Sequence, residues 1–285
     1  MSISSQKINH KKNLVLINTL KTVFVILVAL ISCIPFLWIV MSAFKDRMEI
    51  MSPTLQLFFK PTLSNFKEAF GPSGGFSFYL RNSLIVGISN VILCLITGIP
   101  TAYSFSRFYM LGAKHLYFYI LTTRMCPGIA VALPLYILFN KLNLLGTLPG
   151  VILAHATFTL ALVIYLMKSL FDAIPKEIDR AALVDGYSEW QVFTRVILPI
   201  AKSSIASTAF LAFIYSWNEF LFSMLLGGQA ARTLPAAFPG LVTALGTYWG
   251  QLCAAATVVA VPVIIIAALL QRYLVQGLTL GAVKG

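Results

Sequence analysis

Long apolar stretches constrain the fold of this chain more than any other feature. A helix needs about 20 mainly apolar residues to cross a bilayer. The stretches 22–44 and 82–106 exceed that length without a single charged residue. The other candidates are 116–139, which is interrupted only by Arg124, and 148–167, 203–226 and 251–273. The pattern predicts an all-α integral membrane protein with about six transmembrane helices.

The composition excludes a soluble globular domain. Only 11% of the residues are charged, whereas soluble domains carry about 25%. The 21 Lys and Arg residues against 9 Asp and Glu give a formal charge of +12. In membrane proteins such an excess collects in cytoplasmic loops and near anionic headgroups, and no basic run here alternates with aromatic residues that could stack on bases. The lipid bilayer is thus an expected partner, and nucleic acid is not.

The distribution of lysine and arginine predicts how the chain crosses the membrane. The segment 168–202 holds five of these residues, while the loops that follow the third and fifth stretches hold one each. Because cytoplasmic loops are enriched in positive charge, both termini are predicted in the cytoplasm. The first external loop, 45–81, departs from the rule with five basic residues of its own. Its prolines and glycines, with an amphipathic stretch at 63–70, indicate a small extracytoplasmic cap.

Two short helices are predicted in the cytoplasmic segment 175–199, which reads PKEIDRAALVDGYSEWQVFTRVILP. Acidic residues follow Pro175 and stabilise the positive end of the first helix. Gly186 can take the left-handed conformation that ends this helix. Ser188 and Gln191 have the spacing of a capping box that starts the second helix, which Pro199 is predicted to end.

One face of the first short helix consists largely of small side chains. Ile178, Ala181, Ala182 and Asp185 recur at steps of three and four residues, so they share that face. Small side chains let another protein surface approach closely, which favours a docking site. An amphipathic helix that rests on the lipid headgroups explains the same pattern. The residues alone do not choose between these two interpretations.

The same segment resembles the EAA loop of ABC-importer permeases. Ala-Ala at 181–182, Asp-Gly at 185–186 and Ile-Leu-Pro at 197–199 stand at that family's spacings, while Arg180 replaces its glutamate. The resemblance implies a type I ABC-importer permease fold, a single permease domain over 1–285, and a coupling loop at 172–200 that docks on an ATPase. The residues it assigns to this contact are Glu177, Asp179, Arg180, Ala181, Ala182, Asp185 and Gly186.

Further motifs resemble the smaller permease subunit of maltose-type carbohydrate importers. They are Pro134, the block Trp-Asn-Glu-Phe at 217–220, and the GAVKG tail. The resemblance implies a multi-pass subunit of the inner membrane that imports a carbohydrate or polyol. Its expected partners are a second, different permease subunit, two ATPase subunits and an extracytoplasmic solute-binding protein. The residues expected to contact the ATPase through the tail are Val283, Lys284 and Gly285.

The chain contains no G-x-x-x-x-G-K-[ST] phosphate loop. It is therefore predicted not to be an enzyme, and no cofactor is expected in it, because ATP and Mg²⁺ would bind to the partner ATPase subunits. No catalytic motif is apparent, and the four cysteines lack metal-binding spacing. An ion-coupled secondary transporter and an intramembrane enzyme are the alternative classes, and dependence of uptake on ATP distinguishes the first of these from an ABC importer.

Ionisable residues inside the predicted spans are candidates for the solute pathway, since a charge at the bilayer centre costs about 2.5–3.5 kcal/mol. Arg124 has two interpretations: a donor to solute hydroxyls, or an ion pair with Glu219 that pins two helices. Glu219 is expected to be structural or associated with a gate, and His155 to make a helix–helix contact. Tyr215 and Asn218 could bind a sugar ring or simply pack. The pathway candidates are Arg124, Tyr215, Asn218 and Glu219.

Overall fold

The computed structural model describes the backbone of residues 3–54, 56–72, 74–244 and 246–279, and the side chains of 17–271 within those ranges. The regular secondary structure of this part is helical apart from a short antiparallel hairpin of β1 (Val242–Thr243) and β2 (Gly246–Thr247). Two compact units can be distinguished, one of 1–69 with 248–257 and the other of 70–247 with 258–285. A single permease domain over 1–285 stays a prediction.

The first unit contains α1 (Ile3–Ala43), α2 (Arg47–Ile50), α3 (Ser64–Phe70) and the beginning of α13 (Trp249–Thr279). The helix α3 covers the amphipathic stretch noted in the sequence. Its buried Asn65 amide donates to the carbonyls of Ala43, at 3.0 Å, and Lys45, at 2.7 Å. One side chain thus satisfies the carbonyl of the last residue of α1, which has no partner in its own helix, and a second carbonyl just beyond the helix.

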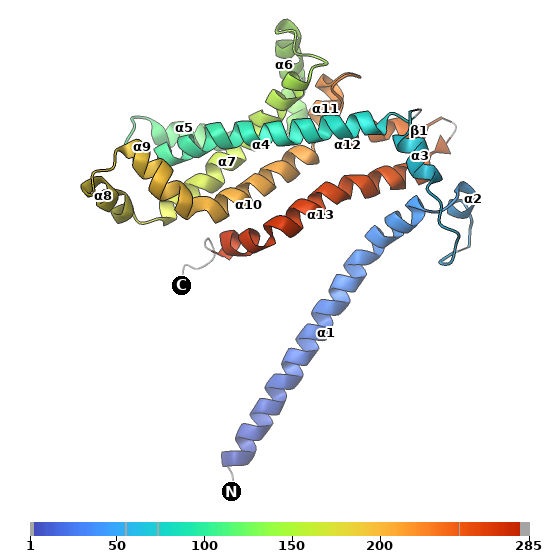
Figure 1. Ribbon diagram of the computed structural model, residues 1–285, viewed down its shortest axis with the longest axis horizontal. Helices are drawn as coiled ribbons and strands as arrows, with labels where there is room; N and C mark the ends of the chain where they lie inside the picture. Colours follow the sequence, from blue (N-terminus) through green and yellow to red (C-terminus); the bar gives the residue numbers. More distant parts are fainter. Residues whose placement is uncertain (1–2, 55, 73, 245, 280–285) are drawn as a thin grey trace. The chain divides into compact units, whose positions relative to one another are not determined.

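The core of the second unit consists of α4 (Phe76–Arg107), α7 (Leu148–Ala173) and α10 (Leu198–Trp217), which pack against one another (Figure 1). The close approach of α4 to α7 depends on Gly98. A Cβ atom there would lie 2.8 Å from Cγ1 of Val163, which is too short for a side chain to fit. Small residues allow membrane helices to pack at this distance.

The third predicted span, 116–139, is divided in two. The helix α5 (Ala113–Thr122) ends before Arg124, and α6 (Gly128–Lys141) starts after Pro127. Proline disfavours the helical conformation of the residue before it and has no N–H to donate. The hydroxyls of Thr122 and Thr123 donate to carbonyls of the last turn of α5, each at 2.7 Å. These bonds keep backbone acceptors satisfied beside the break.

The segment 175–199 forms the two predicted short helices, α8 (Lys176–Val184) and α9 (Glu189–Gln191). Ser188 and Gln191 make the predicted capping box. The prediction that Pro199 ends the second helix is wrong, because the chain continues through a π-helical turn, η1 (Val192–Ile197), into α10. Proline clashes with the carbonyl of the preceding turn in a regular helix, and the wider π-helical turn lies directly before it.

The fifth predicted span, 203–226, is also interrupted. The helix α10 ends at Trp217, and the short helix α11 (Leu221–Leu226) follows. After it come α12 (Leu234–Ala237), the 3₁₀ turn η2 (Phe238–Leu241) and the β-hairpin. Within the described residues, five helices are long and apolar enough to cross a membrane. The predicted all-α membrane architecture is confirmed, with the third span split into two shorter helices.

Candidate functional site

A buried ion pair fixes the α8–α9 hairpin to the helical core. The side chain of Asp179 in α8 faces inward, and its Oδ2 lies 3.1 Å from Nη2 of Arg107 at the end of α4. Oδ1 accepts from the Tyr103 hydroxyl at 2.8 Å and from Nε of Arg107 at 3.1 Å. Arg107 also donates to the carbonyls of Phe171 and Ile174, at 2.8 and 3.0 Å. The carboxylate thus joins α8 to the ends of both α4 and α7.

This geometry changes the interpretation of the predicted docking face. Ala182 is buried beside Asp179, whereas Ala181 and Asp185, predicted on the same face, are exposed. The charged side chains of Glu177 and Arg180 are also exposed. Of the seven predicted coupling residues, five therefore remain available to a partner: Glu177, Arg180, Ala181, Asp185 and Gly186. Their role in coupling stays a prediction.

The turn between α8 and α9 takes the conformation that Gly186 was expected to allow. Its φ is +89°, and the Tyr187 N–H donates to the Ala182 carbonyl at 3.1 Å. A Cβ atom at this position would meet nothing within 4 Å. Glycine is therefore required here by backbone conformation and not by crowding. Beside the turn, Val184 and Trp190 are 87% and 67% exposed, so the tip of the hairpin presents apolar side chains.

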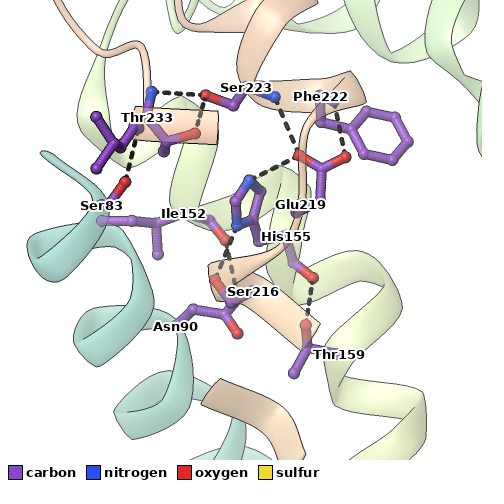
Figure 2. Close-up of polar contacts among 11 residues, drawn as sticks. Ser83, Asn90, Ile152, His155, Thr159, Ser216, Glu219, Phe222, Ser223 and Thr233 are labelled. Carbon is purple, nitrogen blue, oxygen red and sulfur yellow. Dashed lines mark hydrogen bonds and ion pairs between the residues drawn. The ribbon is translucent and has the colours of Figure 1, made fainter. Parts of the chain in front are cut away.

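The break between α10 and α11 is held by a buried polar cluster (Figure 2). Nε2 of His155, from α7, lies 3.0 Å from Oε2 of Glu219. The other ring nitrogen, Nδ1, lies 2.8 Å from the Ser216 hydroxyl. The Glu219 oxygens also accept from the backbone N–H groups of Phe222, at 3.0 Å, and Ser223, at 3.1 Å. Glu219 therefore stabilises the start of α11 and joins it to α7.

Hydroxyl groups extend this cluster to the chain that follows α11 (Figure 2). The Ser223 hydroxyl accepts from the N–H of Thr233 at 2.8 Å and lies 2.7 Å from its hydroxyl. The Ser83 hydroxyl, on α4, accepts from the N–H of Leu234 at 2.7 Å. The bonds to the N–H groups of Thr233 and Leu234 satisfy two buried backbone donors that lipid could not satisfy. The segment around α12 is thus fixed to the helical core.

The four predicted pathway residues line one cavity of about 570 Å³ beside this break. Arg124 and Cys126 contribute from the break in the third span, Tyr215 from the last turn of α10, and Asn218 and Glu219 from the break in the fifth span. The Arg124 guanidinium lies over the Tyr215 ring, 5.3 Å from its centroid. His155 and Ser216 also line the cavity. Both interruptions of the helices therefore meet at a single site in the second unit.

Of the two interpretations of Arg124, the ion pair with Glu219 does not form. Glu219 pairs with His155, for which the sequence suggested only a helix–helix contact. Ser216 and Glu219 lie three residues apart, so in the predicted span 203–226 they would share a helical face, and two polar groups inside a span need a partner. That spacing was the available signal for His155. The predicted tail contacts of Val283, Lys284 and Gly285 lie outside the described residues.

These features define a class: a polytopic helical membrane component with a mainly apolar cavity that holds a few polar groups, and a hairpin fixed to the ends of its helices. The family comparison makes this specific. The profile of the binding-protein-dependent transport system inner membrane components matches residues 94–280. This chain belongs to that family, and it is the permease component of an ABC transporter, not its ATPase.

Curated relatives match over nearly the whole chain. A probable ABC transporter permease protein of Sinorhizobium fredii is 37% identical over 100% of both chains. The trehalose/maltose transport system permease protein of Thermococcus litoralis is 33% identical over 91% of this chain and 94% of that protein. The arabinooligosaccharides transport system permease protein of Halalkalibacterium halodurans is 30% identical over 96% of this chain and 99% of that protein.

A solved structure confirms the fold. One chain of a bacterial ABC transporter involved in the import of the acidic polysaccharide alginate superposes with a TM-score of 0.74. The match covers 90% of this chain and 96% of that chain at 22% sequence identity. The predicted ABC-importer permease architecture is therefore confirmed.

Proposed function

We propose that this chain is one of two permease subunits of an importer that carries a carbohydrate or polyol across the cytoplasmic (inner) membrane. Relatives named for the transport of trehalose or maltose, diacetylchitobiose and arabinooligosaccharides support this solute class. A second, different permease completes the pathway, and an extracytoplasmic binding protein delivers the solute. Two separate ATPase subunits bind ATP and Mg²⁺ and drive the cycle.

The observation that carries this proposal is the construction of the α8–α9 hairpin. Its inner side is fixed by the Arg107–Asp179 ion pair, while Val184 and Trp190 are exposed at its tip. Exposed apolar side chains on a rigid element are typical of a surface that a partner covers. A hairpin anchored to α4 and α7 and continuous with α10 transmits movement of an ATPase to the helices around the cavity.

Solute recognition is assigned to the cavity beside the two helix breaks. Arg124, Tyr215 and Asn218 offer a guanidinium, an aromatic face and a side-chain amide, which are the groups that bind hydroxyl-rich solutes. Glu219 holds the break through its bonds to His155 and to the start of α11. The tail residues Val283 to Gly285 are proposed as a second contact with the ATPase.

The test is to isolate the tagged chain gently from its native membrane and identify what accompanies it. We expect a second permease, a Walker-motif ATPase and a solute-binding protein. The isolated complex is then placed in liposomes with the binding protein outside, and uptake of labelled sugars is measured. Uptake should require ATP inside and survive collapse of ion gradients. Uptake that ignores ATP and vanishes with the gradient overturns the proposal and favours a secondary transporter.

A further inference from the structure

The positive and negative side chains that line the cavity do not form an ion pair with each other. Arg124 is the one lysine or arginine among the described residues that line it, and Glu219 is the one acidic residue in the same set. A simple arrangement would pair these two groups. Instead, none of the ion pairs found in the described part of the chain includes Arg124.

Glu219 is occupied by other donors. Its Oε2 lies 3.0 Å from Nε2 of His155 and accepts from the N–H of Ser223 at 3.1 Å, while Oε1 accepts from the N–H of Phe222 at 3.0 Å. The side chain of Glu219 is 16% exposed. Its negative charge is therefore stabilised within the protein and leaves little acceptor capacity for a group that enters the cavity.

Arg124 is in the opposite situation. Its guanidinium is held against the Tyr215 ring at 5.3 Å from the centroid, and a ring face satisfies none of the N–H donors of the planar fork. The neighbouring lining includes Phe158, Phe220 and Phe222, so the surroundings are mainly apolar. A cation in such a site lacks a counter-charge, and a guanidinium binds a carboxylate through two parallel hydrogen bonds.

We propose that the cavity recognises an anionic group, and that the imported solute is a saccharide that carries a carboxylate. Arg124 is the specificity-determining residue: its guanidinium binds the carboxylate, while Tyr215 holds the guanidinium in place. The Asn218 amide N–H2 donates to the Ile214 carbonyl at 2.9 Å, so its side-chain oxygen is the group offered to ring hydroxyls. This inference rests on the proposed function and narrows its solute class from carbohydrates in general to acidic ones.

Cys126 provides a native reporter, because it lines the cavity and is exposed. The chain is isolated with its partners after Cys33→Ala and Cys253→Ala, while Cys94 is kept because it is buried. Labelling is measured with methanethiosulfonates that carry either a sulfonate or a trimethylammonium group, and each rate is divided by that of a free thiol in solution. A Cys126→Ala control must abolish the signal.

We expect the anionic reagent to react faster, and Arg124→Gln to lower the anion-to-cation ratio about tenfold, as loss of one nearby charge at intermediate dielectric predicts. The control Arg124→Lys should keep the ratio because it keeps the charge. A ratio below one in the parent protein, or a ratio that Arg124→Gln leaves unchanged, overturns the proposal.

The solute class is tested by protection of Cys126. A trimer of galacturonic acid should slow labelling, whereas the same trimer with its carboxylates reduced to hydroxymethyl groups should not. Arg124→Gln should remove the protection, and Arg124→Lys should weaken it because the planar fork is lost. Equal protection by both trimers, protection by neither, or protection by chloride alone overturns the inference. ATP-dependent sugar uptake by the same complex reports separately on the proposed function.

Discussion

At the scale of single residues, Asp179 shows how position decides role. The sequence places it among residues of a docking loop, but its carboxylate is turned toward Arg107 and Tyr103 in the core. The side chains of Arg107 and Asp179 are only 6% and 12% exposed. A charge pair this deeply buried is strongly disrupted when one partner is lost, because the other charge stays buried alone.

We therefore expect Asp179→Asn to destabilise the attachment of the hairpin by about 3–5 kcal/mol. Trypsin should then cleave at Lys176 and Arg180 much faster in the isolated complex, and ATP-driven uptake should fall. Glu177→Gln is the matched control, since Glu177 lies on the same helix in an exposed contact of 4.0 Å with Arg180 and exposed pairs contribute little. Equal cleavage rates in the two variants would contradict the anchoring role.

Gly186 allows a test of backbone conformation without a change in packing. Its φ of +89° disfavours a β-branched residue, so Gly186→Val is expected to strain the turn by about 1–2 kcal/mol and to uncouple ATP hydrolysis from uptake. Gly186→Asn should be milder, because asparagine tolerates this region. Gly240→Val is the control, since its Cβ also meets nothing within 4 Å and its φ is not positive. Unchanged uptake and ATPase stimulation in Gly186→Val counts against the prediction.

At the scale of elements, the interruption between α10 and α11 is held by defined side-chain bonds, just as the helices beside it are held by backbone bonds. Glu219 supplies acceptors for two N–H groups of α11 and binds His155 of α7. Such a break resists the tendency of an apolar segment to continue as one helix. Because the Glu219 carboxylate and the His155 imidazole bind each other, loss of either group is expected to remove the contribution of both.

Glu219→Ala is expected to leave two buried N–H donors and Nε2 of His155 without a partner, at a cost of about 1–3 kcal/mol for each buried group. Uptake should fall at least tenfold, which a change of about 1.4 kcal/mol produces. Adding His155→Ala should cost little more, because the pair is already broken. Thr157→Ala serves as the control on α7, since its exposed hydroxyl only bonds the Leu153 carbonyl of its own helix. Strictly additive losses in the double variant would refute the coupling.

The sequence predicts regular elements better than their interruptions. Apolar length is a local property, so the stretches that form α1, α4, α7 and α13 can be recognised directly. The break at Asn218 depends on a partner far along the chain, His155, which appears only when the helices pack. The break near Arg124 has local causes, Pro127 and the hydroxyls of Thr122 and Thr123. The turn at Gly186 was predictable because its signal, a glycine followed by a capping box, is entirely local.

At the scale of the whole molecule, the distribution of positive charge predicts an orientation that can be measured. A single cysteine at Glu177 should react with an impermeant maleimide only after cells are permeabilised, whereas one at Gly240 should react in intact cells. Both positions are exposed, so access to the reagent is decided by the membrane. Labelling of the Glu177 position in intact cells would show that the topology is the reverse of the predicted one. It would then assign the five basic residues of 45–81 to the cytoplasm.

The π-helical turn η1 determines the angle, about the axis of α10, between the exposed tip of the hairpin and the cavity. Its hydrogen bonds join residues five apart instead of four, and it joins the hairpin directly to α10 without an intervening loop. Each residue of an α-helix rotates the chain by about 100°. Converting η1 into regular α-helix would thus swing the exposed tip of the hairpin through roughly a quarter turn about the axis of α10. The angle between the tip and the cavity therefore depends on the presence of a single additional residue in η1.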